Sequence, residues 1–103
     1  MGKRILLVDD DPHLLSTVQA FLNDEQFQVF LARNYDEALE KIQKAREEEK
    51  PFHLYILDVL MPGKNGLELG KEIRRRADNT PMLFVTGVFK NQGNQRRSSW
   101  DNF

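Results

Sequence analysis

The feature that most constrains the fold is an apolar run that ends in a single carboxylate. Residues 54–57 read Leu-Tyr-Ile-Leu, Asp58 follows, and residues 61–66, Met-Pro-Gly-Lys-Asn-Gly, are rich in loop-forming types. Near-continuous hydrophobic runs are typical of buried parallel strands. Open α/β sheets place their ligand chemistry outside the carboxyl ends of such strands. Asp58 is therefore predicted to lie at a functional edge.

A second apolar run, residues 4–8, leads into three consecutive aspartates, Asp9, Asp10 and Asp11. If the two strands are neighbours, Asp9 and Asp10 meet Asp58 at one edge. Clustered carboxylates repel one another unless a cation or a proton intervenes. Hard oxygen ligands at a partly open site favour Mg²⁺, and an aspartate can itself be a nucleophile that forms an aspartyl-phosphate. Asp11 precedes Pro12 and is predicted instead to cap a helix.

Strand and helix patterns alternate along the chain. Alternation of this kind predicts a parallel sheet with right-handed crossovers. Thr86 ends the last predicted strand, where its hydroxyl could bond a phosphate oxygen. Asn34, with Glu37 three residues later, resembles a capping box at the start of the second helix. In the third helix Leu67, Gly70 and Ile73 are predicted to face inward. The predicted strands are residues 4–8, 27–32, 52–58 and 82–86, and the predicted helices are residues 12–24, 35–48 and 66–77.

Composition limits the classes of function. A chain of 103 residues suits one domain, and a net charge of −1 implies no general attraction to nucleic acid or to anionic membranes. Cysteine is absent, which excludes disulfides, thiolate-zinc sites and cysteine nucleophiles. No run reaches the ~18 apolar residues of a membrane-spanning helix, and the N-terminus lacks a small-residue cleavage site. A cytoplasmic location is expected.

Three motifs together resemble the receiver domain of two-component response regulators. They are Ile-Leu-Leu-Val-Asp-Asp-Asp at 5–11, Leu-Asp-Val-Leu-Met-Pro-Gly-Lys-Asn-Gly at 57–66, and Phe-Val-Thr-Gly at 84–87. The resemblance covers residues 3 to about 88. It implies a flavodoxin-like, doubly wound sheet with helices on both faces, in a three-layer α/β/α arrangement, for which the family strand order is 2-1-3-4-5.

The resemblance also implies a role for each site residue. Asp58 would be the phosphoacceptor, which takes a phosphoryl group from a histidine kinase or a phosphotransfer protein. Asp10 would bind Mg²⁺ directly, Asp9 largely through water, and the backbone carbonyl of Leu60 would be a further ligand. Thr86 would be the hydroxyl that senses the phosphoryl group. The chain would then be a phosphoacceptor in a phosphorelay and not a turnover enzyme.

The sequence departs from the family pattern after Thr86. The family continues with a fourth helix, a fifth strand that ends in Lys-Pro, and a fifth helix, and neither Lys64 nor Lys90 stands at the position of the family's phosphate-binding lysine. We therefore expect an incomplete receiver domain over residues 1–88, with strand order 2-1-3-4 and without the fifth strand and last helix. Residues 89–103 are expected to form an atypical polar tail.

An incomplete domain of this kind would expose one face of the sheet and leave the fourth strand as an open edge. A homodimer is therefore predicted, through the exposed face or the tail, with Phe89, Trp100 and Phe103 as anchors. Alternatively, the sequence of the tail is non-native, or comes from a shifted reading frame of a longer protein.

Two other functions compete with phosphorelay signalling. One is a degenerate receiver that binds proteins without being phosphorylated. The missing family lysine favours this function, whereas the intact acids and Thr86 oppose it. The other is a dehalogenase-type aspartyl phosphatase, because the aspartates at 9–11 contain Asp-x-Asp. That family has Thr or Val shortly after its acids, where this chain has His13 and Leu14.

Overall fold

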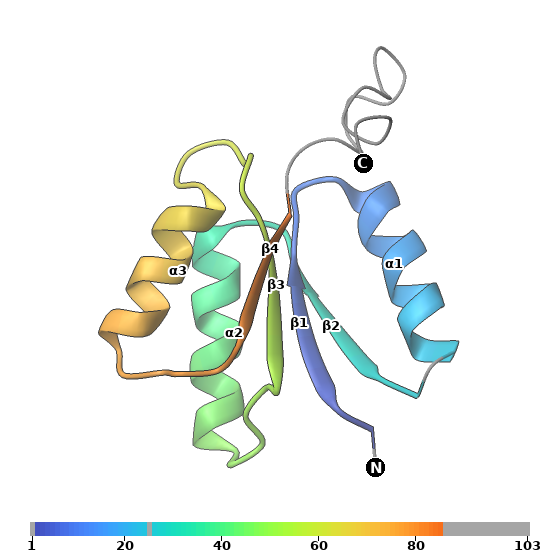
Figure 1. The fold of residues 1–103 in the computed structure, drawn as a ribbon, viewed down its shortest axis with the longest axis horizontal. Coiled ribbons are helices and arrows are strands. Elements are labelled where there is room, and N and C mark those ends of the chain that lie inside the picture. Colours follow the sequence, from blue (N-terminus) through green and yellow to red (C-terminus); the bar gives the residue numbers. More distant parts are fainter. Residues whose placement is uncertain (1, 25, 86–103) are drawn as a thin grey trace.

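The computed structural model describes residues 2–24 and 26–85, which form an alternating α/β structure (Figure 1). Every element predicted for this part is present, with ends that differ from the prediction by at most two residues. The predicted end of the fourth strand, Thr86, lies outside the described residues. The elements are β1 (Arg4–Val8), α1 (Pro12–Asp24), β2 (Gln28–Ala32), α2 (Tyr35–Glu47), β3 (Leu54–Asp58), α3 (Gly66–Arg75) and β4 (Met82–Val85).

The four described strands form one parallel sheet in the order β2-β1-β3-β4, which confirms the predicted order. α1 lies on one side of the sheet, and α2 and α3 lie on the other, so there are three layers (Figure 1). Val8 of β1 pairs with Leu57 of β3. Asp58, the next residue, pairs with Val85 of β4. The predictions about residues 89–103 lie outside the described residues.

The larger core lies between the sheet and the pair α2 and α3. Alternate residues of β1 and β3 fill it, and Leu6, Tyr55 and Leu57 are each at most 1% exposed. Phe52 packs edge-on against Tyr55, with 6.0 Å between the ring centroids. Burial of apolar surface stabilises the folded state by about 25 cal/mol per Å² removed from water. This packing therefore fixes the position of β3, the strand that carries Asp58.

α3 turns a different face to this core than the sequence predicted. Gly70 and Ile73 are buried as expected, together with Leu69, but Leu67 is 47% exposed, so its predicted inward position is wrong. Successive helical residues are rotated by about 100°. Leu67 therefore points almost opposite to Leu69, and the side of the helix that contains residues 69, 70 and 73 packs on the sheet.

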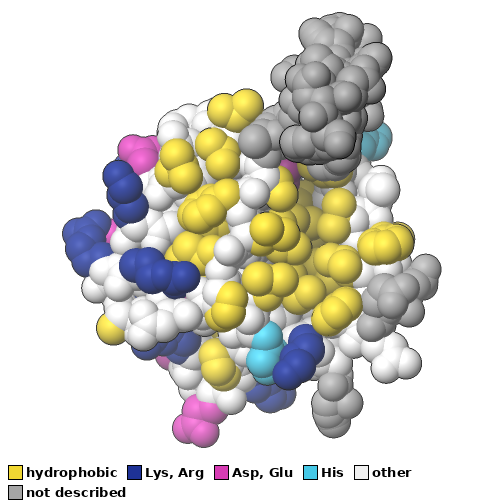
Figure 2. All heavy atoms as spheres, viewed as in Figure 1, with side chains coloured by type: hydrophobic (Ala, Val, Ile, Leu, Met, Phe, Trp, Pro, Cys, Tyr) yellow, Lys and Arg dark blue, Asp and Glu magenta, His cyan; other side chains and the backbone are white. Residues whose placement is uncertain are grey.

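The core on the α1 side is smaller. Leu7, Leu15 and Val29 are its buried members, so α1 covers β1 and β2. The same side of β3 and β4 is only partly covered, and Leu83 of β4 is 52% exposed. Figure 2 shows hydrophobic side chains gathered in this region, between β4 and α1.

Both predicted helix caps are present. The Asp11 carboxylate accepts a hydrogen bond from His13 N at 3.0 Å, at the start of α1. The Asn34 side chain accepts one from Glu37 N at 2.8 Å, at the start of α2. The return bond differs from the predicted capping box, because the Glu37 carboxylate accepts from Arg33 N at 2.6 Å.

Candidate functional site

Three aspartates meet at the carboxyl edge of the sheet. Asp9 follows β1 and Asp58 ends β3, and these strands are direct neighbours. One carboxylate oxygen from each of Asp9, Asp10 and Asp58 can be chosen so that all three lie within 4.8 Å of one another. Asp9 is 1% exposed and Asp58 is fully buried, while Asp10 is half-buried. The structure thus brings together the acids that the sequence singled out.

Backbone groups orient two of these carboxylates. Asp11 N donates a hydrogen bond to Asp9 Oδ1 at 2.9 Å, and Leu60 N donates one to Asp58 Oδ1 at 3.1 Å. Asp9 N in turn donates to Ala32 O of β2 at 3.0 Å, which ties the edge to the sheet. Three carboxylates this close repel one another, and a divalent cation relieves that repulsion. The oxygen-only donor set, partly open through Asp10, fits Mg²⁺.

The loop after β3 is held close to the site by Gly66, the first residue of α3. A Cβ atom at this position would lie 2.2 Å from the backbone oxygen of Asp58 and 2.7 Å from its carbonyl carbon. Gly66 N also donates a hydrogen bond to Val59 O at 3.3 Å. Any larger residue would force α3 and the end of β3 apart, so the glycine allows the helix to begin beside the site.

A capping box fixes the start of the same helix. The Asn65 side chain accepts a hydrogen bond from Glu68 N, and the Glu68 carboxylate accepts one from Asn65 N, both at 2.9 Å. This capping box was not predicted from the sequence, although Asn-x-x-Glu before a helix is a recognised capping pattern. Lys64 extends the loop toward α2, with its Nζ 4.7 Å from the centre of the Tyr35 ring.

Leu60 and Thr86 are the two remaining predicted site residues. The Leu60 side chain is 56% exposed, and its backbone carbonyl remains a predicted ligand. Thr86 lies outside the described residues. The residue before it, Val85, is hydrogen-bonded across the sheet, because Val59 N donates to Val85 O at 2.8 Å.

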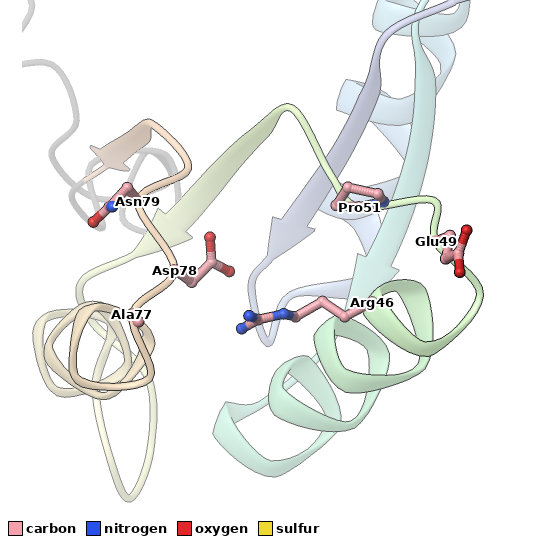
Figure 3. Close-up of a pocket in the computed structure, with 6 residues that line it drawn as sticks. All are labelled: Arg46, Glu49, Pro51, Ala77, Asp78 and Asn79. Carbon is pink, nitrogen blue, oxygen red and sulfur yellow. The ribbon is translucent and has the colours of Figure 1, made fainter.

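A separate pocket of about 420 Å³ lies between the end of α2 and the loop before β4, at the amino-terminal edge of the sheet. In Figure 3 the Arg46 side chain extends from α2 toward Asp78. Tyr55 Oη donates a hydrogen bond to Asp78 Oδ2 at 2.5 Å, and the Thr80 hydroxyl donates to Asp78 Oδ1 at 2.6 Å. The lining residues are Arg46, Glu49, Pro51, Ala77, Asp78 and Asn79.

This hydrogen-bond network shifts two pKa values. Burial raises the pKa of the Tyr55 hydroxyl, and the hydrogen bond to Asp78 raises it further. Burial also acts to raise the pKa of Asp78, but hydrogen bonds from Thr80 and Tyr55 outweigh burial, so the pKa lies below its usual value. Asp78 therefore stays charged, at the opposite edge from the three site acids.

The family model of the response regulator receiver domain matches residues 5–97. The chain belongs to this family. The resemblance found in the sequence is thus confirmed, and the match extends past residue 88. Receiver domains are generally signalling modules rather than enzymes, and they bind Mg²⁺ at an acidic pocket.

Individual receiver proteins agree with this. The chain is 41% identical to the regulatory protein VanRB of Enterococcus faecalis over 88 residues, which cover 85% of this chain and 37% of that protein. It therefore spans little more than a third of that relative. Its fold matches TrrA of Thermotoga maritima in complex with Mg²⁺ and BeF, with a TM-score of 0.71 and 34% identity over 95% of this chain and 79% of that one.

A second solved structure contains TrrA together with the histidine kinase ThkA, and the fold matches there with a TM-score of 0.74 and 34% identity, over 95% of this chain and 78% of that one. These receiver structures confirm the flavodoxin-like fold. Among the described helices of this receiver domain, none is long and apolar enough to cross a membrane.

Proposed function

We propose that this chain is a phosphoacceptor module of a two-component phosphorelay, with Asp58 as the acceptor. The observation that supports this best is the grouping of Asp9, Asp10 and Asp58, whose carboxylate oxygens come within 4.8 Å of one another at the end of two adjacent strands. Asp58 alone of the three belongs to a strand, and the loop after it holds its carboxylate through Leu60 N.

Asp58 would act as the nucleophile. A carboxylate oxygen forms a bond to the phosphorus of a phosphohistidine as the phosphorus–nitrogen bond breaks, and the histidine nitrogen keeps the electron pair. The hydrogen bond from Leu60 N to Oδ1 keeps the carboxylate at the open edge of the sheet. Gly66 also helps to hold Asp58 in this position, because α3 begins directly against the Asp58 backbone.

Asp9, Asp10, Asp58 and the Leu60 carbonyl would hold the Mg²⁺ ion. Asp10 is the most exposed of the three acids and would bind the ion directly, while the buried Asp9 would act largely through water. When bound, Mg²⁺ neutralises charge on a transferring phosphoryl group. The oxygen-only donors and the repulsion between the carboxylates favour this ion.

We assign the sensing of the phosphoryl group to the hydroxyl of Thr86. The support is positional, since Val85 pairs with Asp58 and Thr86 is the next residue. A new dianionic group at Asp58 would attract this hydroxyl and shift an equilibrium between two states. The donor would be a histidine kinase or a phosphotransfer protein, and the complex of TrrA with ThkA supports a kinase.

Incubation with acetyl phosphate and Mg²⁺, followed by intact-protein mass spectrometry, tests the proposal. The wild-type chain should gain one phosphoryl group, and Asp58→Asn should gain none. Asp78→Asn is the matched control, because Asp78 is a partly buried aspartate at the opposite edge, and it should keep the adduct.

Two outcomes would support the competing functions. The absence of an adduct on the folded wild-type chain would favour a receiver that binds proteins without being phosphorylated. An adduct that survives Asp58→Asn but is lost on Asp9→Asn would favour an aspartyl phosphatase. Either result would overturn the assignment of Asp58.

A further inference from the structure

A pocket of about 240 Å³ lies between the last turns of α2 and the start of β1. It belongs to the β1 and β2 side of the sheet, at the other end of the strand order from β4. We call it the basic pocket, because three cations and one acid line it together with two aromatic rings. These residues are Arg4, Lys41, Lys44, Glu48, Phe30 and Phe52.

Arg4 is held in position by contacts on two sides of its side chain. Its guanidinium carbon lies 4.5 Å from the centre of the Phe30 ring and 5.3 Å from that of Phe52. Its Nε donates a hydrogen bond to Lys50 O at 3.0 Å. Within the part of the chain that the structure describes, the two terminal nitrogens of Arg4 donate no hydrogen bond. The guanidinium is thus oriented by the protein while most of its donors remain for a ligand.

Two lysines extend the positive charge beside Arg4. Lys41 and Lys44 are three residues apart on α2, so their side chains leave the helix on the same side. None of the three cations forms an ion pair with a described residue. A lysine in the last turn of a helix complements the helix dipole, which accounts for Lys44. It does not account for Lys41, which precedes that turn, or for Arg4, which belongs to β1.

The balance of charge indicates which anion the basic pocket suits. Three cations against the single carboxylate of Glu48 leave an excess of two positive charges, in a chain whose net charge is −1. A phosphate monoester carries about −1.5 to −2 at pH 7, more than the single charge of a carboxylate. Arginine binds phosphate oxygens through paired N–H donors, and lysine adds a point charge. The pocket therefore matches a phosphate monoester better than a carboxylate.

The size and the aromatic side of the pocket indicate what the phosphate is attached to. A water molecule takes up about 30 Å³, so 240 Å³ is room for about eight waters, more than a bare phosphate needs. It is also below the ~300 Å³ at which pockets for drug-sized ligands begin. The Phe30 ring, which packs edge-on against Phe52 with 5.5 Å between the centroids, is only partly buried. It can therefore contact an organic group.

From these features we propose that the basic pocket binds a small organic phosphate. Arg4, Lys41 and Lys44 hold its phosphate group, and its organic part lies against Phe30. This site is separate from phosphoryl transfer at Asp58, because Arg4 begins the strand that Asp9 follows. At ~3.3 Å per residue the two ends of that strand are about 15 Å apart.

An NMR titration of the full chain tests the proposal, in buffer without divalent cations so that the three acids do not attract phosphate. The probe is phenyl phosphate, which should bind with a dissociation constant of about 0.1–1 mM and shift the signals of the Arg4 side chain and of the Lys41 and Lys44 amides. Inorganic phosphate should bind about fivefold more weakly, because it lacks the aromatic contact. Phenol, which lacks the phosphate, should cause no such shifts.

Variants of the lysines show whether the binding depends on this pocket. Lys41→Gln and Lys44→Gln should each raise the dissociation constant about tenfold, as for the loss of one charge-assisted hydrogen bond. Both lysines are at least partly exposed, so these variants should fold. Lys71→Gln is the matched control, because Lys71 is an exposed lysine of α3, and it should leave the affinity unchanged. Glu48→Gln should tighten binding, because it removes the acid from the pocket.

Three results would overturn the proposal. One is the absence of saturable shifts up to about 10 mM phenyl phosphate. Another is an equal loss of affinity in Lys44→Gln and Lys71→Gln, which would mean general attraction to positive charge. The third is inorganic phosphate that binds as tightly as phenyl phosphate, because the aromatic side would then take no part. Asp58→Asn should bind phenyl phosphate like the wild type, so this test and the test of phosphorylation succeed or fail separately.

Discussion

Gly66 illustrates how a residue without a side chain positions an acid. Adding one methyl group in Gly66→Ala should cost about 1–3 kcal/mol of stability, because the new Cβ would lie 2.2 Å from the Asp58 backbone oxygen. It should also weaken Mg²⁺ binding, since Asp58 must shift to relieve the contact. Isothermal titration with Mg²⁺ and thermal unfolding measure the two effects.

Gly63→Ala is the control for that change. Gly63 has a φ of +74°, so alanine costs about 1–2 kcal/mol there, but nothing lies within 4 Å of the new Cβ. Stability should fall while Mg²⁺ affinity stays unchanged. Equal losses of affinity in the two variants would contradict a specific role for Gly66.

Asp78 should make stability depend on pH. Burial acts to raise the pKa of Asp78, but hydrogen bonds from Thr80 and Tyr55 hold it below its usual value in the folded state. The stabilisation is therefore present above the unfolded-state pKa of about 4 and is lost as the pH falls through the lower folded-state pKa. Asp78→Asn should be less stable than wild type at pH 6, and the gap should narrow in acid.

Melting temperatures measured from pH 3 to 6 (about one unit below and two units above that unfolded-state pKa) would show the narrowing gap. Tyr55→Phe removes one of the donors, so the wild-type transition in acid should move to higher pH in this variant. A gap between wild type and Asp78→Asn that stays constant with pH would count against the assignment.

Among the elements, α3 depends most on its first turn. Asn65→Ala removes one half of the capping box and should cost about 1 kcal/mol, which chemical denaturation can measure. Asn34→Ala at the start of α2 is the comparison, and its loss should be similar because Glu37 N loses the same kind of acceptor. An unchanged midpoint for Asn65→Ala would mean that packing alone fixes the helix.

The elements also show how far the sequence alone could lead. The strands were predicted well because two apolar runs ending in acids leave little choice in an alternating chain, and the sheet order followed from the motifs at 5–11 and 57–66. The convergence of the acids followed from adjacent strand ends. Leu67 was placed wrongly because two sets of residues in α3 have helical spacing, and only packing against the sheet and α2 chooses between them.

Other features depend on contacts that no local pattern contains. The hydrogen bond between Tyr55 and Asp78 joins residues far apart in the sequence, and the close approach of Gly66 to Asp58 is set by how the loop folds back. The partly covered side of β3 and β4 that faces α1 could be anticipated only as an exposed surface. Its form, a step beside α1, required the position of the helix on the sheet.

At the scale of the whole molecule, Mg²⁺ should stabilise the fold. A ligand at 100 times its dissociation constant adds about 2.7 kcal/mol, which corresponds to a rise in melting temperature of about 10 °C or more for a domain of this size. Asp10→Asn should lose most of this rise, whereas Asp78→Asn should keep it. Identical melting curves in Mg²⁺ and in EDTA would rule out a metal site at the three acids.

β3 is held at both of its ends. Tyr55, near its start, is hydrogen-bonded to Asp78, and the backbone of Asp58, at its end, lies directly against the first turn of α3. Contacts at both ends oppose any shift of β3 along its own axis. We therefore expect a rearrangement that starts at the three acids to move the loops around the carboxyl edge of the sheet. The amino-terminal edge of the sheet should keep its position.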